Sequence, residues 1–111
     1  MPDERMRSGP VTVLIALLLA GAWARPAQAS SWSGLQANAM RCLQGGQNSA
    51  CQTAILQAES LARRATARNA FPCQTLLLGL QADFIMQQLG DGRGAQAIDA
   101  VAATGRGCAG L

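Results

Sequence analysis

Four cysteines are the residues of this sequence with the clearest capacity for chemistry, as nucleophiles, metal ligands or disulfide partners. They are Cys42, Cys51, Cys73 and Cys108. No two of them form a C-x-x-C pair, the spacing typical of redox-active thiols and zinc knuckles. The chain has no histidine, so it cannot build a Cys-His dyad or a His-ligated zinc or haem site. The pattern therefore predicts structural disulfides, with no metal and no cofactor.

The carboxylates give no pattern typical of catalysis. Glu59 has Arg63 four residues later as a helical partner, and Asp91 belongs to an Asp-Gly turn. Asp83 and Asp99 stand alone, so no helix holds the pair of carboxylates that a hydrolase of that type needs. We therefore predict that the protein is not an enzyme and has no catalytic residues.

The positive charge is weak and local. A formal net charge of +3 is too small for a nucleic-acid-binding surface, so we expect no nucleic acid partner. Arg64 and Arg68 share one helical face at i, i+4. They suit a solvated helix end, where cations complement the helix dipole. The alternative is a contact with an anionic partner or with membrane headgroups.

The N-terminus has the three regions of a secretory signal peptide. Arg5 and Arg7 precede an uninterrupted apolar run over 11–24. A polar stretch follows and ends in Ala27-Gln28-Ala29, a small-x-small cleavage pattern. The run is shorter than the ~20 residues of a spanning helix, although an uncleaved anchor or a buried helix is the alternative. We predict a Sec-type signal peptide over residues 1–29 and an exported protein, periplasmic or secreted.

Residues 30–111 are then a single small domain with no transmembrane span. All four cysteines lie in this part. An even number of cysteines in a small exported domain predicts two disulfides. A domain of this size buries a modest core and commonly needs such covalent links.

Four segments have the apolar spacing of helices. Ser30 or Ser31 can cap the first, and Gly45-Gly46 ends it. Ser49 and Gln52 form a capping box at the start of the second, with Asn69 past its end. The third begins near Pro72 and ends at Gly90, and the fourth covers about 95–104 with Gly105 past its end. The sequence predicts an all-α fold, a small up-and-down bundle of four short helices.

The positions of the cysteines select one disulfide pairing. Short loops make consecutive helices antiparallel neighbours. Cys42 and Cys51 then lie at one end of the bundle, and Cys73 and Cys108 at the other. The second helix is about 25 Å long, whereas a disulfide tolerates a Cα separation of only about 7 Å. We predict Cys42–Cys51 and Cys73–Cys108.

The third helix has two apolar stripes on roughly opposite sides. One holds Cys73, Leu76, Leu77, Leu80 and Phe84, and the other holds Leu78, Ala82, Ile85, Met86 and Leu89. Two interpretations are open. The bundle wraps this helix on all sides, or the second stripe is partly exposed and binds a protein partner, a second copy or a lipid chain.

These observations favour a non-enzymatic interaction or binding module. Its candidate contact residues are Leu78, Ile85, Met86 and Leu89. The alternative function is a small carrier of a lipid or other apolar ligand, held between the third helix and its neighbours. The sequence identifies no partner, ligand or oligomeric state.

Overall fold

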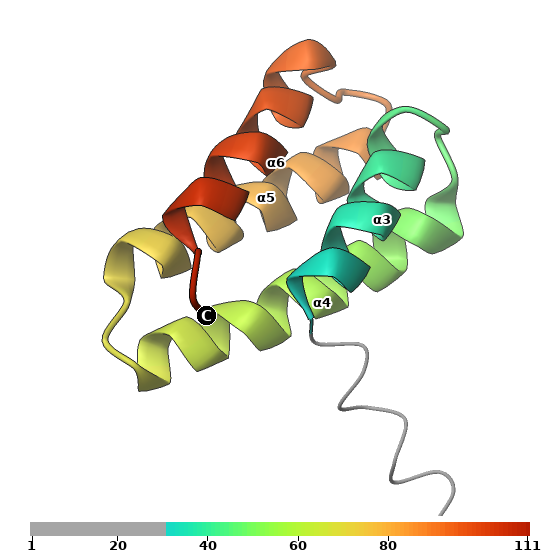
Figure 1. The fold of residues 1–111 in the computed structure, drawn as a ribbon. Helices are drawn as coiled ribbons and strands as arrows, with labels where there is room; N and C mark the ends of the chain where they lie inside the picture. Colours follow the sequence, from blue (N-terminus) through green and yellow to red (C-terminus); the bar gives the residue numbers. More distant parts are fainter. Residues whose placement is uncertain (1–30) are drawn as a thin grey trace, which may run out of the picture.

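The computed structural model describes residues 31–111 as a bundle of helices (Figure 1). In chain order they are α3 (Trp32–Leu43), α4 (Asn48–Ala67), α5 (Phe71–Gln88) and α6 (Ala95–Gly107). No strand occurs in this range, which confirms the all-α prediction. The predicted signal peptide over residues 1–29 lies outside the described residues. None of the helices described is long and apolar enough to cross a membrane.

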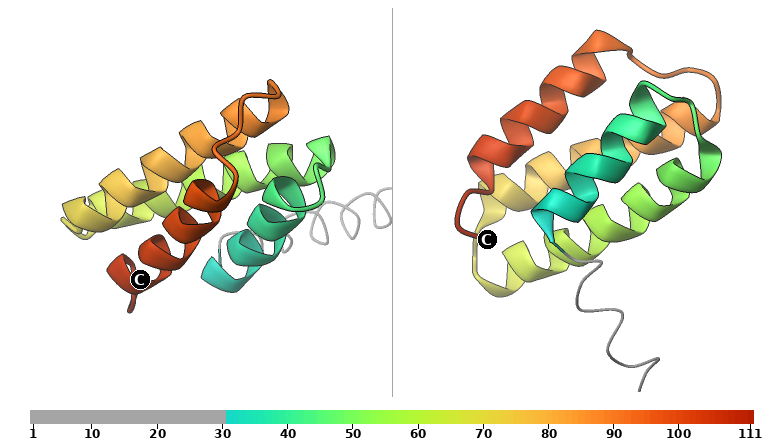
Figure 2. Two further views of the ribbon diagram at one scale, coloured as in Figure 1. Left: turned by 90° about the horizontal axis from the view of Figure 1, so that it is seen from above. Right: turned by 45° about the vertical axis from the view of Figure 1, so that its right-hand side comes forward.

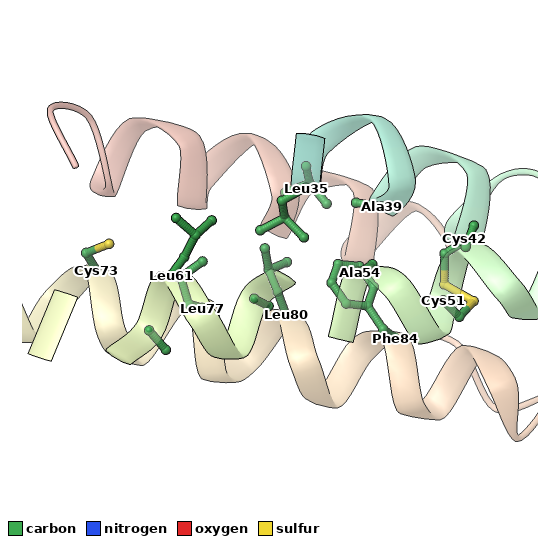
Figure 3. Packing of buried hydrophobic residues seen from close by; sticks show 14 of the residues in the cluster. Leu35, Ala39, Cys42, Cys51, Ala54, Leu61, Cys73, Leu77, Leu80 and Phe84 are labelled. Carbon is green, nitrogen blue, oxygen red and sulfur yellow. A yellow bond between two sulfur atoms is a disulfide. The ribbon is translucent and has the colours of Figure 1, made fainter. Parts of the chain in front are cut away.

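The helices form two layers (Figures 2 and 3). The long helices α4 and α5 pair with each other, and theirs is the most extensive contact in the bundle. The shorter α3 and α6 lie on the same side of that pair, α3 against α4 and α6 against α5. Consecutive helices are therefore neighbours, as in the predicted up-and-down arrangement.

Both predicted disulfides are confirmed, one at each end of the bundle. Cys42 and Cys51 join α3 to α4 with a Cα separation of 4.6 Å. Cys73 and Cys108 join the start of α5 to the end of α6 at 4.9 Å. No cysteine among residues 31–111 is free. Two structural disulfides are typical of extracellular or periplasmic proteins.

The side chains between the layers form one core, shown in Figure 3. Leu35 from α3 and Leu77, Leu80 and Phe84 from α5 are fully buried. The helix α4 contributes mainly alanines to this core, so its backbone can approach its neighbours closely. The buried stripe on α5 is therefore the first of the two stripes that the sequence defines.

Helix starts were predicted correctly for α3 and incorrectly for α4. The Ser31 hydroxyl accepts a hydrogen bond from Gly34 N at 3.1 Å, which is the predicted N-cap. The predicted capping box of Ser49 and Gln52 is wrong. Cys51 N already donates to Gln47 O at 3.0 Å, so α4 begins earlier and Ser49 lies inside its first turn. At the other end of α4, Asn69 has the expected positive φ of 57°.

The helix α6 continues beyond the predicted stop at Gly105, as far as Gly107. Gly105 lies inside the helix and permits close packing, whereas Gly107 is the last residue of the helix. A Cβ atom on Gly105 would lie 2.9 Å from the Trp32 ring, and one on Gly107 would lie 2.3 Å from Leu76 Cδ1. These contacts bring α6 against α3 and α5, so glycine here marks a close approach.

Candidate interaction surface

The second stripe of α5 is exposed. Leu78, Ile85, Met86 and Leu89 are all between 39 and 70% accessible to solvent. The interpretation in which the bundle wraps this helix on all sides is therefore wrong. The neighbours α4 and α6 cover only the side of α5 that carries Leu77, Leu80 and Phe84.

The exposed surface extends further than the sequence predicted, because Phe71 at the start of α5 is 51% exposed. Phe71 lies seven residues before Leu78, a spacing that could have identified it. We call the exposed side of this helix the α5 face, which consists of Phe71, Thr75, Leu78, Ala82, Ile85, Met86 and Leu89. From Phe71 to Leu89 it is about 27 Å long.

The α5 face contains no charged residue. The single charged residue of α5 is Asp83, which lies outside this face and is only 4% exposed. A surface helix normally carries charged side chains on its solvent side. The apolar area here is on the order of 500 Å², in the range where the largest patch on a monomer is often functional. The α5 face is therefore the strongest candidate for a binding surface in residues 31–111.

Gly79 lies beside the α5 face, in the interior of the helix, and no contact within one copy of the chain requires it. A Cβ atom at this position would meet nothing within 4 Å. Glycine destabilises a helix interior by roughly 1 kcal/mol relative to alanine. The helix α5 therefore has a small residue where its own fold would accept a larger one.

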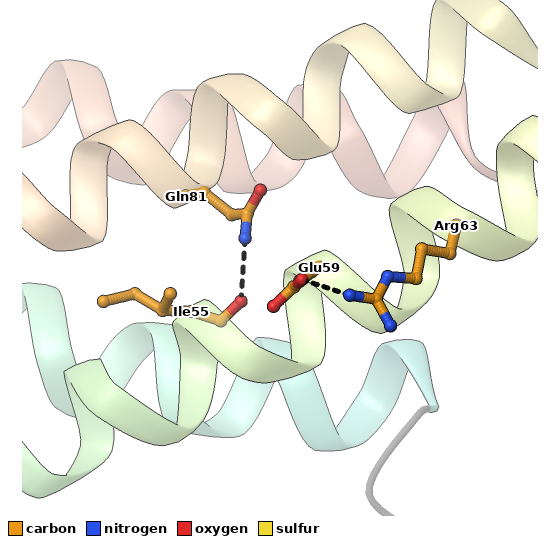
Figure 4. A network of polar contacts seen from close by, with 4 residues as sticks. All are labelled: Ile55, Glu59, Arg63 and Gln81. Atoms are coloured by element: carbon orange, nitrogen blue, oxygen red, sulfur yellow. Dashed lines mark hydrogen bonds and ion pairs between the residues drawn. The ribbon is translucent and has the colours of Figure 1, made fainter.

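Glutamines border the α5 face on the side of α4. Gln81 Nε2 donates to Ile55 O at 3.2 Å, as Figure 4 shows. Gln88 Nε2 donates to Gln52 Oε1 at 2.8 Å. These uncharged bonds hold α4 and α5 together beside the face, so the residues of α5 that form this border are polar and uncharged.

One further leucine, Leu56 on α4, is 62% exposed. The neighbouring positions on the same side of α4 are the polar Gln52, Ser60 and Arg63. Arg63 pairs with Glu59, as predicted (Figure 4). Leu56 is therefore an isolated exposed leucine outside the α5 face, and it provides a matched control for substitutions in that face.

The predicted anionic contact, Arg64 and Arg68, belongs to the end of α4 and is not part of the α5 face. Arg68 Nη1 donates to Leu111 O at 3.3 Å, which directs this guanidinium toward the C-terminal residues. Arg64 is half-buried on the same side of α4. Their contact with an anion stays a prediction.

A hollow of about 430 Å³ lies between the start of α3, the middle of α4 and the end of α6. Its mostly apolar lining consists of Trp32, Leu61, Gly105, Cys108, Ala109, Gly110 and Leu111. Its volume falls in the range of small-molecule sites. No residue of α5 lines it, so the expected position of an apolar ligand, against the third helix, is not where this hollow lies.

Asp83 has a structural partner. Arg93, in the loop between α5 and α6, donates from Nε and Nη2 to the two Asp83 oxygens at 2.7 and 2.8 Å. The hydrogen bond to Asp83, and then its negative charge, raise the pKa of Arg93. At neutral pH the raised pKa of Arg93 contributes stability to the fold, and as the pH rises this contribution is lost only in strong alkali. In residues 31–111 no group of acidic, histidine or cysteine side chains could hold a metal ion.

The two members of this ion pair should respond unequally to removal. We expect Arg93→Gln to lower the melting temperature more than Asp83→Asn. The first variant leaves a buried carboxylate without its cation, whereas the second leaves an arginine that is 49% exposed and can turn to water. Thermal unfolding followed by circular dichroism at neutral pH measures both. Equal shifts, or a larger shift for Asp83→Asn, would show that the buried carboxylate does not depend on Arg93.

Comparison with models of protein families, with curated proteins and with solved structures found no match to this chain.

Proposed function

We propose that this chain is an exported, non-enzymatic interaction module that docks a protein through the α5 face. One observation carries the proposal: an uncharged helix face about 27 Å long presents five large apolar side chains to solvent. The cores of protein interfaces are depleted of charged residues and enriched in aromatic residues and methionine. The α5 face has both properties.

A protein partner fits the α5 face better than a membrane surface does. Helices that lie in a membrane interface carry lysine or arginine beside their apolar side. The helix α5 has neither residue, and the positions that border its apolar side toward α4 are glutamines. Of the three arginines at the end of α4, Arg63 is paired with Glu59 and Arg68 is directed toward Leu111.

Export is the second element of the proposal. The charged start, the apolar run over 11–24 and Ala27-Gln28-Ala29 support a Sec-type signal peptide over residues 1–29. The two disulfides support a periplasmic or secreted location, because cytosolic reductants keep most thiols reduced. The mature protein would then consist of residues 30–111.

Site-specific photocrosslinking in the native host tests the proposal. A photoreactive phenylalanine analogue replaces Ile85 in the full-length chain, and Leu56 in the matched control. We expect irradiation to give a discrete covalent adduct from position 85 and none from position 56. Absence of any adduct at position 85 would contradict docking through the α5 face. The same preparation gives the intact mass, which should correspond to a chain beginning at Ser30; an uncleaved mass would contradict export by this route.

The alternative function, a carrier of an apolar ligand, is supported by the hollow beside Trp32 and Leu61. Its volume and apolar lining suit one short acyl chain or a ligand of similar size. Mass spectrometry of the gently purified protein under native conditions separates the two functions. A bound lipid favours the carrier, whereas a bare chain that still crosslinks at position 85 favours the interaction module.

A further inference from the structure

We propose that the partner of the α5 face is a second copy of the same chain, docked with the two α5 helices antiparallel about a two-fold axis level with Leu80. This inference rests on the proposed function, because it uses the same surface. It adds the identity of the partner and the register of the contact.

The spacing of the exposed residues is that of a helix seam. Along α5 they alternate in steps of four and three, the repeat with which two helices pack side by side. The six positions are Phe71, Thr75, Leu78, Ala82, Ile85 and Leu89. In a single copy this seam faces water. A second helix packed along it would bury these positions.

The seam is complementary to itself when it is reversed about Leu80. Thr75 then faces Ile85 of the other copy, and Leu78 faces Ala82, so that each large side chain meets a small one. At the two ends Phe71 faces Leu89. Helices that cross at about 20° separate toward their ends, where two large side chains have room. A two-fold contact repeats every one of these pairs.

Other registers of the two helices leave gaps, crowded side chains or unpaired residues along the seam. A parallel pair would place Ala82 against Ala82 and Phe71 against Phe71, leaving gaps at the small residues and crowding at the large ones. An antiparallel pair shifted by one heptad would leave Phe71 and Thr75, or Ile85 and Leu89, without a partner. The register centred on Leu80 is the one that engages all six positions.

The proposed dimer explains why a glycine occupies position 79. It lies beside the two-fold axis, next to Gly79 of the other copy, where the two backbones come closest. A residue without a Cβ atom permits that approach. Within one copy nothing occupies the space around Gly79.

The electrostatics also permit self-association. Two identical charged surfaces would place like charges opposite each other, which disfavours docking. The α5 face has no charge, and its border toward α4 consists of Gln74, Gln81 and Gln88. Glutamine amides both donate and accept hydrogen bonds, so identical borders are compatible with each other.

The available area predicts a weak dimer. Two α5 faces with their polar borders would bury about 1,200 Å², the lower limit for specific stable interfaces. We therefore expect a dissociation constant of about 1–100 µM, so that monomer and dimer exchange over accessible concentrations.

Sedimentation velocity of the disulfide-bonded protein over about 0.5–500 µM tests the dimer. We expect a concentration-dependent shift from monomer to dimer. Ile85→Asp should raise the dissociation constant by at least about tenfold, because each copy then buries an unpaired carboxylate. Leu56→Asp makes the same chemical change outside the seam and should leave the constant unchanged. A protein that stays monomeric throughout, or equal effects of the two variants, would overturn the proposal.

Crosslinking between single-cysteine variants tests the register. All four native cysteines are in disulfides, so an introduced cysteine supplies the one free thiol of the folded domain. A mixture of Thr75→Cys and Ile85→Cys chains should form a mixed disulfide on mild oxidation, and Thr75→Cys alone should form little. A strong Thr75→Cys homodimer would indicate a parallel pair and would overturn the antiparallel register.

The photocrosslinking experiment distinguishes failure of this inference from failure of the proposed function. An adduct of twice the chain mass at position 85 supports both. An adduct with a different protein supports the interaction module and overturns the second copy as partner. If position 85 gives no adduct and the protein is monomeric, both proposals are wrong.

Discussion

Replacing Cys73 and Cys108 together by alanine is expected to lower the free energy of unfolding by about 4 kcal/mol, and replacing Cys42 and Cys51 by about 2.7 kcal/mol. The difference follows from the lengths of chain that the two disulfides close, with sequence separations of 35 and 9 residues. A longer closed loop removes more conformational entropy from the unfolded chain. Urea unfolding of the two double variants at equilibrium measures the effect.

The structure gives a second reason to expect a larger loss of stability when Cys73–Cys108 is removed than when Cys42–Cys51 is removed. The Cys73–Cys108 link holds the end of α6, a helix that contacts mainly α5. Without it, α6 depends on the Asp83–Arg93 pair and on packing around Val101 and Thr104. The result would contradict this account if the variant lacking Cys42–Cys51 were the less stable of the two.

Phe84→Ala is expected to lower the free energy of unfolding by about 3–5 kcal/mol. Phe84 is the largest of the fully buried side chains and lies between the two layers of helices, as Figure 3 shows. Its removal loses apolar burial and leaves a cavity that the disulfide-linked helix ends cannot easily close. Denaturant unfolding at a protein concentration low enough to exclude self-association provides the measurement.

Leu89→Ala provides the matched control for this variant, because it also truncates an apolar side chain at α5. Leu89 is 70% exposed, so its truncation should change monomer stability by less than about 0.5 kcal/mol. A large loss for Leu89→Ala, or a small one for Phe84→Ala, would mean that the two sides of α5 are assigned the wrong way round.

The sequence was sufficient to predict the helices and the disulfide pairing, because both depend on local spacing and on the length of α4. It could not decide whether the stripe with Ile85 and Met86 is covered. Helical periodicity shows which residues share a side of a helix, but not which sides neighbouring helices occupy. Phe71 was overlooked because it precedes Pro72, where the helix was expected to begin.

Glycine was the residue type with the least predictable role. Gly46 and Gly90 have positive φ angles and follow helices, as expected. Gly105 has the same local setting in the sequence but lies within α6 against Trp32. The local sequence around a glycine does not show whether it ends a helix or permits a tertiary contact. For Gly105 the neighbour that decides this is Trp32, which is more than 70 residues away in the chain.

The packing of Trp32 on Gly105 also means that intrinsic tryptophan fluorescence reports on one defined part of the domain. Trp32 is the single tryptophan of residues 31–111, and the sequence has no tyrosine. Its half-buried indole lines the hollow between α3, α4 and α6, and no residue of the α5 face lines that hollow. Intrinsic fluorescence would therefore respond to a ligand entering the hollow and would be insensitive to pairing through α5. The two proposed events, ligand binding and pairing through α5, would therefore have separate spectroscopic signatures in the unlabelled domain.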